Sequence, residues 1–325
     1  MGDWKRYLEK AGGGSLLKQY IRNHTLGVAI NQFVAIGRDK KALELLRLAV
    51  EYKFLKRLRT KERSLIGQIA IAVKNSHNPS EVKKSKIIWI CWWQGIENAP
   101  ELVKKCYNSI CYYFSDWDIR VITSDNYLEY VDFPDYIIEK WKAGKISNTH
   151  MSDLLRLELL IKHGGLWLDS TIMATSSALP KSIINSDLFF YQTLKPGADG
   201  HSILLSSWLI YAKSNNCILK LTRELLYNYW KNAEKLSDYF LLHYYMTIAC
   251  EIYQDEYDKI PQFSNEIPHI LLLNLFKQYN QSYMDDLNQM TCFHKLSYKL
   301  DPDNIIDSKG SYYDWIMNKL NYDVS

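Results

Sequence analysis

Residues Ser152–Thr171 read SDLLRLELLIKHGGLWLDST, and this stretch decides the fold. Apolar residues recur at helical spacing through Ser152–His163, and Gly164 stands where a helix ends in a left-handed cap. Leu166–Leu168 is a short apolar strand that leads to the polar run beginning at Asp169. A helix followed at once by a strand with polar residues at its carboxyl end is typical of α/β sheets, which bind ligands at that edge.

The same alternation extends in both directions along the chain. Short β-rich runs are separated by helical stretches, which predicts a sheet whose central strands are mostly parallel. The predicted strands are Lys86–Trp93, Ile119–Thr123 and Leu188–Gln192. The predicted helices are Ala99–Tyr113, Ser202–Ala212, Asn216–Trp230, Ser237–Tyr253 and Tyr312–Leu320.

The region before the first predicted strand has a different composition. Residues 16–73 contain no proline and place Leu, Ala, Lys, Arg and Glu at helical spacing. The stretch Asn75–Ser80, which includes Pro79, is typical of a linker. We therefore expect a helical region over residues 1–80 and an α/β domain over residues 81–325.

Composition and motifs exclude several classes of protein. Apolar residues make up 47% of the 325 residues and charged residues 23%, as in a globular chain. No apolar run reaches the length of about 18 residues that a transmembrane helix needs. Met1–Lys5 lacks the apolar segment of a secretory signal, so we expect a cytoplasmic protein whose six scattered cysteines stay reduced. The absence of GxGxxG, GxxxxGK[ST] and GxSxG motifs disfavours a Rossmann oxidoreductase, a P-loop hydrolase and an α/β-hydrolase.

Charge is distributed unevenly along the chain. Residues 1–85 carry 18 Lys and Arg against 7 Asp and Glu, a net charge of +11, whereas the remainder carries 22 against 29, a net charge of −7. Within Lys53–Arg63, six cations face one acid, Glu62. We expect this basic region to bind an anionic membrane surface, with a solvated helix face or a self-associating helix as alternatives. Nucleic acid is not an expected partner, because the acidic remainder repels a phosphate backbone.

Two charged side chains share a face of the predicted helix in the deciding stretch. Asp153 and Arg156 stand three residues apart, and Asp169 follows the next strand. Such a cluster can offer a carboxylate to a sugar hydroxyl or to a metal ion. The alternative is a surface ion pair beside an ordinary turn.

Several runs in fixed order carry a family resemblance. They are KIIWICWWQG at residues 86–95 with NAP at 98–100, the Ser152–Thr171 stretch, DYFLLHY at 238–244 and HKLSYK at 294–299. Together they resemble the capsular polysaccharide synthesis proteins and, more distantly, the DXD-containing sugar-binding glycosyltransferases. The resemblance implies a GT-A-like, Rossmann-type mixed sheet flanked by helices. It also implies transfer of a sugar, with retention of configuration, from a UDP-linked donor to a lipid-linked or oligosaccharide acceptor.

The resemblance implies roles for residues around the donor. Related enzymes stack a first-strand tryptophan on the nucleotide base, which implies this role for Trp89, although burial in the sheet core is the alternative. Asp153 and Arg156 would hold the nucleotide, ribose or phosphates, and Ser170 and Thr171 would join them. Lys295 or Lys299 would neutralise the diphosphate as it leaves.

The resemblance also implies a divalent cation. Asp169 matches the first carboxylate of the DXD motif, but Thr171 stands where the second would be. A hydroxyl is a poor ligand for a hard cation, so His294 would complete the site, which favours Mn²⁺ over Mg²⁺. The alternative for His294 is a loop histidine without a ligand role.

Three further residues are expected on the acceptor side. Asp238 would orient the acceptor hydroxyl or steady the cationic transition state, with a helix cap as the alternative. His243 and His269 follow in motifs that match the family, although His243 among aromatics also fits a packed histidine. Two other functions stay open, a sugar-phosphate transferase and a scaffold that binds glycans or nucleotides without catalysis.

Overall fold

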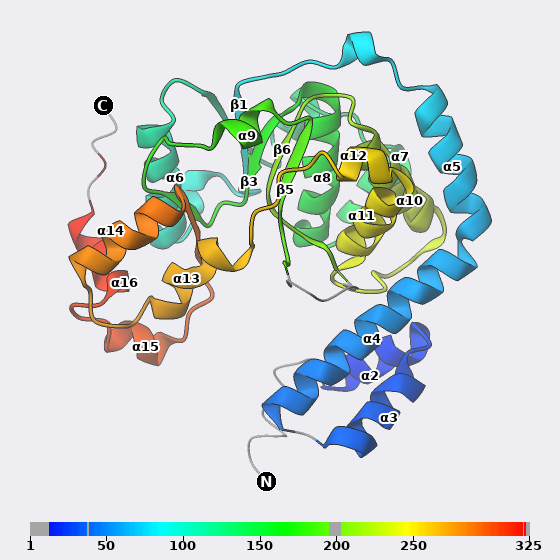
Figure 1. Ribbon diagram of the computed structural model, residues 1–325, viewed down its shortest axis with the longest axis horizontal. Helices are drawn as coiled ribbons and strands as arrows, with labels where there is room; N and C mark the ends of the chain where they lie inside the picture. Colours follow the sequence, from blue (N-terminus) through cyan, green and yellow to red (C-terminus); the bar gives the residue numbers. More distant parts are fainter. Residues whose placement is uncertain (1–12, 38, 195–202, 321, 323–325) are drawn as a thin grey trace.

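A mixed five-stranded sheet forms the centre of the protein (Figure 1). The computed structural model describes residues 13–37, 39–194, 203–320 and 322. The strands, in the spatial order β2-β1-β3-β6-β5, are β1 (Ile87–Cys91), β2 (Asp118–Ile122), β3 (Gly165–Leu168), β5 (Leu188–Gln192) and β6 (Leu205–Ala212). β1 is parallel to β2 and β3, whereas β6 is antiparallel to β3 and β5. The predicted class, a mixed α/β sheet flanked by helices with a helical N-terminal region, is confirmed.

Alternating side chains of the strands feed two separate cores. Ile88 and Leu166 face the side covered by α6 (Glu101–Tyr113). Trp89 and Trp167 face the other side, which is covered by α8 (Asn148–His163), α10 (Cys217–Asn232) and α11 (Leu241–Ile252). Asp169 comes two residues after Trp167, so strand alternation directs it toward the α8 side of the sheet.

The turn between α8 and β3 depends on two glycines. Gly164 and Gly165 have φ angles of +70° and +104°, a backbone conformation that residues with a side chain rarely adopt. A Cβ atom on Gly165 would lie 2.6 Å from the carbonyl oxygen of Ile87, so this position accepts no side chain without a shift of the backbone. The close approach lets β3 pair with β1 directly after the helix ends.

The N-terminal helices pack partly on themselves and partly on the main core. They are α2 (Gly13–Arg22), α3 (Leu26–Ile36), α4 (Lys40–Lys61) and α5 (Arg63–Asn75). Ala29, Leu46 and Val50 form a small core of their own, but Phe54 and Leu58 belong to the core under α10 and α11. The domain boundary near residue 80 stays a prediction, and apolar packing crosses it.

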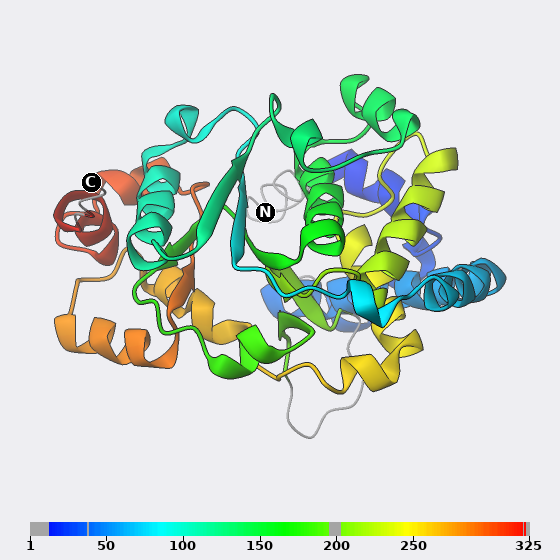
Figure 2. The ribbon, with the colours of Figure 1, turned by 90° about the horizontal axis from the view of Figure 1, so that it is seen from above.

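A C-terminal unit covers the end of the sheet opposite to α5 (Figures 1 and 2). It contains a second, two-stranded antiparallel sheet of β4 (Ile172–Ala174) and β7 (Phe293–Lys295). Its helices are α13 (Glu266–Asn274), α14 (Gln281–Met290), α15 (Pro302–Ile306) and α16 (Tyr312–Asp314), the last followed by a π-helical turn at Trp315–Lys319. The remaining helices are α7 (Asp135–Lys142), α9 (Lys181–Asn185) and α12 (Gln254–Tyr257).

One predicted element is wrong. The predicted helix Ser202–Ala212 is strand β6 over Leu205–Ala212, and nearly all of its side chains are buried. Side chains of β6 enter both cores, Ile210 on one side of the sheet and Leu209 on the other, so both of its faces are covered. A short run that is apolar on both faces has no period by which a helix could be told from a strand.

No helix among the described residues is both long and apolar enough to cross a bilayer. The expectation about a signal segment concerns Met1–Lys5, which lies outside the described residues.

Candidate active site

A cavity of about 480 Å³ opens at the carboxyl ends of β1 and β3. Six of the predicted site residues line it: Arg156, Asp169, Ser170, Thr171, Lys295 and Lys299. The lining also includes residues that sequence reasoning missed, among them Trp92, Trp93, Ser152, Trp167, Tyr239 and Tyr298. The structure therefore joins the deciding stretch, the first strand and the HKLSYK segment at one place.

Asp169 is the acidic centre of this cavity. Its Oδ1 accepts a hydrogen bond from Trp167 Nε1 at 3.1 Å and lies 3.5 Å from Arg156 Nη2. Its Oδ2 lies 3.3 Å from Lys295 Nζ. Both carboxylate oxygens thus face a cation.

Arg156 holds Asp169 in place more than it offers donors to a ligand. Its Nε donates to the Ser152 carbonyl at 3.3 Å, its Nη1 to the Ser207 carbonyl at 2.5 Å, and its Nη2 lies 3.2 Å from Asp153. Its guanidinium also stacks over the Trp167 ring at 4.9 Å. Most of its five N–H groups are therefore committed within the protein.

Behind Arg156, buried polar groups form a chain. Trp230 Nε1 donates to His150 Nε2 at 2.9 Å, so the proton of neutral His150 lies on Nδ1, which is 3.2 Å from Asp153. Burial raises the pKa of Asp153, but Arg156 and His150 outweigh it and lower the pKa below its usual value. Asp153 lies outside the cavity lining and acts on Arg156, so it is not placed to touch a nucleotide.

Lys295 reaches the cavity through the β4–β7 ladder. It pairs with Ile172 in register, and its ammonium donates to the hydroxyl of Thr171. His294, the preceding residue, points to the opposite face, is 0% exposed, and lies 3.1 Å from Asn288 through Nε2. The expectation that His294 binds a metal together with Asp169 is therefore wrong, because neighbouring residues of a strand face opposite sides.

The residues around Asp169 do not fit a divalent cation held by the protein. Among the described residues, no group of three or more His, Cys, Asp and Glu side chains is arranged to hold a metal. Asp169 is a single carboxylate, and Lys295 and Arg156 stand against its oxygens where a cation would bind. A metal ion there would meet the repulsion of two like charges.

The prediction for Trp89 is also wrong. Its side chain is 0% exposed, and its Nε1 donates to the Gly164 carbonyl at 2.9 Å within the sheet core. Trp92 and Trp93 line the cavity instead. Trp92 lies past the end of β1 with its ring 5.5 Å from that of Tyr298, whereas Trp93 donates to Ser152 Oγ and is largely buried.

The three residues expected on the acceptor side lie outside the cavity lining. Asp238 accepts from Gln19 Nε2 at 2.7 Å and from the Phe240 amide at 2.9 Å, so it stabilises the turn before α11 and joins it to α2. His243 packs on Phe240, and burial lowers the pKa of His243 to about 4. His269 Nδ1 lies 2.7 Å from the Asn265 carbonyl on α13.

The sequence carries a signal for two of the missed residues, Trp167 and Ser152. Trp167 stands two residues before Asp169 and shares its strand face, and Ser152 stands one helical turn before Arg156. Tyr239 and Tyr298 had none, because only the tertiary fold brings their segments to Asp169.

Comparison with known proteins gives relatives of one kind. The chain is 24% identical over 242 residues to the O-glycosyltransferase braB of Annulohypoxylon truncatum, covering 68% of this chain and 53% of that protein. It is 25% identical over 189 residues to the O-glycosyltransferase PaGT of Phomopsis amygdali, covering 52% and 43%. The chain thus spans about half the length of the curated relatives it matches.

Among solved structures, a chain described as PaToxG Glycosyltransferase aligns with 82% of this chain and 98% of its own length, at 15% identity and a TM-score of 0.38. A sequence profile described as capsular polysaccharide synthesis protein matches residues 45–316, well over half of the 325 residues. The chain belongs to the capsular polysaccharide synthesis protein family.

Proposed function

We propose that the protein is a glycosyltransferase that moves a sugar from a UDP-linked donor to a lipid-linked or oligosaccharide acceptor in the assembly of a surface polysaccharide. The observation that carries the proposal is the convergence of Asp169, Lys295 and Lys299 on one cavity at the carboxyl ends of β1 and β3. Ligands of α/β sheets bind at this edge. Family membership and the named relatives support the same reaction.

The cations in the cavity suit a departing diphosphate. Transfer breaks the bond between the anomeric carbon and the diphosphate oxygen, so negative charge grows on that oxygen. The Lys295 ammonium sits on a short β ladder, and Lys299 is exposed four residues later at the cavity wall. Both take up the diphosphate charge, while Arg156 keeps Asp169 oriented and Trp92 offers a ring to the uracil base.

The lining supports retention of configuration. Asp169 is the only carboxylate among the lining residues that the structure describes, and it is held between two cations. Both of its oxygens already contact side chains of the protein, which leaves little of the carboxylate free to take a proton from an acceptor hydroxyl. An acceptor hydroxyl that enters on the same face as the departing diphosphate can pass its proton to a diphosphate oxygen, so a separate base on the opposite face is not required.

The basic N-terminal region supports action at the inner face of a membrane. Lys53, Arg57 and Lys61 recur every four residues on α4 and so form one stripe. Cations near an anionic leaflet contribute about 1 kcal/mol each. We propose that this stripe holds the protein peripherally where a lipid-linked acceptor is available.

Analysis of the product tests the proposal. The protein is incubated with a panel of UDP-sugars and a membrane extract as acceptor, beside the Asp169→Asn variant, and the product is examined by mass spectrometry and NMR. A new glycosidic bond formed only by the unsubstituted protein supports the proposal. A phosphodiester in the product would assign a sugar-phosphate transferase instead, and donor binding without any product would leave a binding scaffold.

A further inference from the structure

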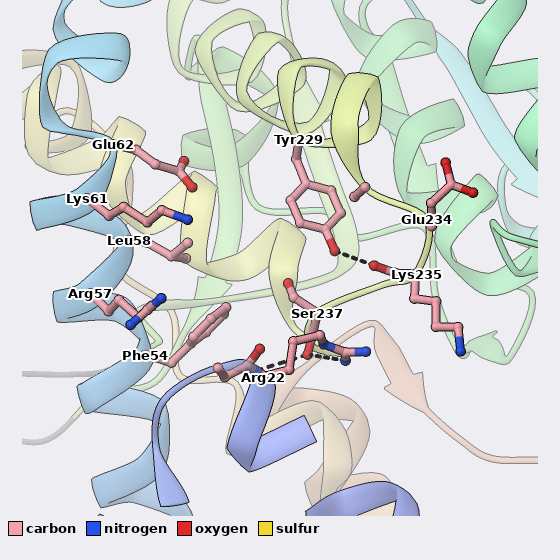
Figure 3. A pocket seen from close by; sticks show the side chains of 12 residues that line it. Arg22, Phe54, Arg57, Leu58, Lys61, Glu62, Tyr229, Glu234, Lys235 and Ser237 are labelled. Atoms are coloured by element: carbon pink, nitrogen blue, oxygen red, sulfur yellow. Dashed lines mark hydrogen bonds between the residues drawn. The ribbon is translucent and has the colours of Figure 1, made fainter. Parts of the chain in front are cut away.

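A second cavity, distinct from the candidate active site, lies where the N-terminal helices meet the main domain (Figure 3). Its volume is about 400 Å³. Helix α4 forms one wall with Phe54, Arg57, Leu58, Lys61 and Glu62. Arg22 at the end of α2, Tyr229 in the last turn of α10 and the segment from Ala233 to Ser237 after it form the other.

The cavity is basic, and its cations lack acidic partners. Within the described part of the chain, no carboxylate forms an ion pair with Arg22, Arg57, Lys61 or Lys235. Among the residues that the structure describes, Arg22 donates only through Nη2, to the carbonyls of Leu236 and Ser237 at 2.8 and 3.1 Å, and its other N–H groups have no partner there. Figure 3 shows Arg57 and Lys61 reaching from α4 toward the side that carries Tyr229.

The two acids of the lining are engaged elsewhere. Glu234 forms ion pairs with Lys140 at 3.1 Å and with Lys145. Glu62 accepts a hydrogen bond from the Tyr245 hydroxyl at 2.9 Å, and burial raises its pKa. Glu234 is balanced by two lysines outside the lining, and Glu62, which interacts with Lys61, cannot alone balance four cations, so the cavity keeps a net positive charge.

Apolar surface lies beside these cations. Phe54 and Leu58 are buried and stand on the same side of α4 as the stripe, and the Tyr229 ring crosses the cavity from α10. A ligand that matches both features has an anionic head and an apolar body. Guanidinium and ammonium groups together bind phosphate well, because the first gives a planar fork and the second a mobile point charge.

We propose that this cavity binds the phosphate group of an amphiphilic phosphate ester. A short segment of the same chain, from Ser237 to Tyr239, connects this site to the candidate active site. Ser237 lines the basic cavity, and Tyr239, two residues later, lines the cavity around Asp169. Because an extended chain spans at most about 3.6 Å per residue, their Cα atoms lie within roughly 7 Å of each other. A phosphate bound here lies near the wall of the candidate active site that carries Tyr239.

Binding of soluble phosphates gives the first test. Inorganic phosphate and glycerol 3-phosphate are titrated into the full-length protein by calorimetry. We expect the double variant Arg57→Gln, Lys61→Gln to bind them about tenfold or more weakly, since two charge-assisted contacts are lost. The matched control is Lys40→Gln, Lys41→Gln, which makes the same change of charge on exposed positions of the same helix, outside both the cavity and the stripe of Lys53, Arg57 and Lys61.

Flotation with vesicles identifies the source of the phosphate. If a membrane lipid supplies it, the cavity variant detaches from phosphatidylglycerol vesicles more than the control does, and neither binds phosphatidylcholine. If only the soluble esters distinguish the two variants, the ligand is a free phosphate ester. Equal losses in both double variants, or no binding of phosphate to the unsubstituted protein, would overturn the proposal. Binding of UDP-sugar, measured on the same variants, stays unchanged, so this proposal and the proposed transfer reaction fail separately.

Discussion

The Lys295 ammonium lies 3.3 Å from the Asp169 carboxylate, which joins the β7 strand to the residue that follows β3. In a site built around a metal, a cation bound by this carboxylate would carry the charge of the donor diphosphate. Here a side chain of the protein stands in that position. Because of this contact, we expect sugar transfer to depend on the Lys295 ammonium and not on a divalent cation.

Replacing Lys295 with Gln should lower kcat strongly. Loss of a preorganised group that stabilises the leaving charge costs on the order of 100- to 1,000-fold in rate. Steady-state kinetics with a UDP-sugar measure the effect, and Lys277→Gln, outside the cavity lining, is the control. A Lys295→Gln protein with unchanged kcat would show that the ammonium has no part in transfer.

Transfer should continue after divalent cations are removed. Asp169 already faces two cations in the folded protein, so a chelator removes nothing that the site requires. Activity after dialysis against EDTA should stay within about twofold of the untreated value, because no transition-state contact is lost. Titration with Mn²⁺ gives a second measurement through the fluorescence of Trp167, which contacts Asp169. Saturable quenching by Mn²⁺ that the Asp169→Asn variant lacks would contradict this expectation.

Trp89 and Trp92 should respond to substitution in opposite ways. Trp92→Ala should raise KM for the donor, since stacking of an aromatic ring on a base contributes about 1–3 kcal/mol, with little change in stability. Trp89→Phe should leave KM unchanged but destabilise the fold, because the Gly164 carbonyl loses its donor, at a cost of about 1–3 kcal/mol. Donor kinetics and urea unfolding of the two variants separate these effects. A rise of KM in the Trp89→Phe protein would restore the interpretation of Trp89 as a base-stacking residue.

Stability should fall between pH 7 and pH 5, in part through His294. Burial lowers the pKa of this imidazole to about 4. In the unfolded chain it titrates near about 6.5, so protons bind the unfolded state first as the pH falls. Its contribution is full above about pH 6.5 and declines toward about pH 4, and the loss amounts to roughly 2 kcal/mol by pH 5.

Urea unfolding at pH 7 and pH 5 measures this loss. The His294→Gln variant should lose less stability over the interval than the unsubstituted protein. His24→Asn, at an exposed position, should leave the dependence as it was. Identical pH profiles of the His294→Gln and unsubstituted proteins would exclude this role.

The fold could be predicted where local signals agree. The helix of Ser152–His163, the glycine pair and the strand that leads to Asp169 share one stretch, and the structure has α8, the turn and β3 there. The strand β6 could not be predicted in this way. It is apolar on both faces because a core lies on each side of the sheet, and that environment arises only when the chain is folded.

The candidate site, like the fold, could be predicted from the sequence only in part. Asp169, Arg156 and Lys295 meet as the order of the motifs indicated, but the direction of a side chain from a strand requires the register. Trp89 and His294 each belong to a matching motif, yet both face a core. In each segment a near neighbour, Trp92 or Lys295, reaches the cavity. Family motifs therefore located the segments. Strand parity then selected Lys295 over His294, and the end of β1 at Cys91 freed Trp92 to reach the cavity.

The hydrogen bond between Gln19 and Asp238 has a consequence for shortened forms of the protein. A chain that begins at residue 45, where the family match starts, would retain the sheet and the side chains around Asp169. It would lack Gln19, which holds the turn adjacent to Tyr239. A wall that loses such an anchor opens more readily. Truncation at this point would therefore yield a folded protein with a loosened rim, impaired in substrate handling while its interior stays intact.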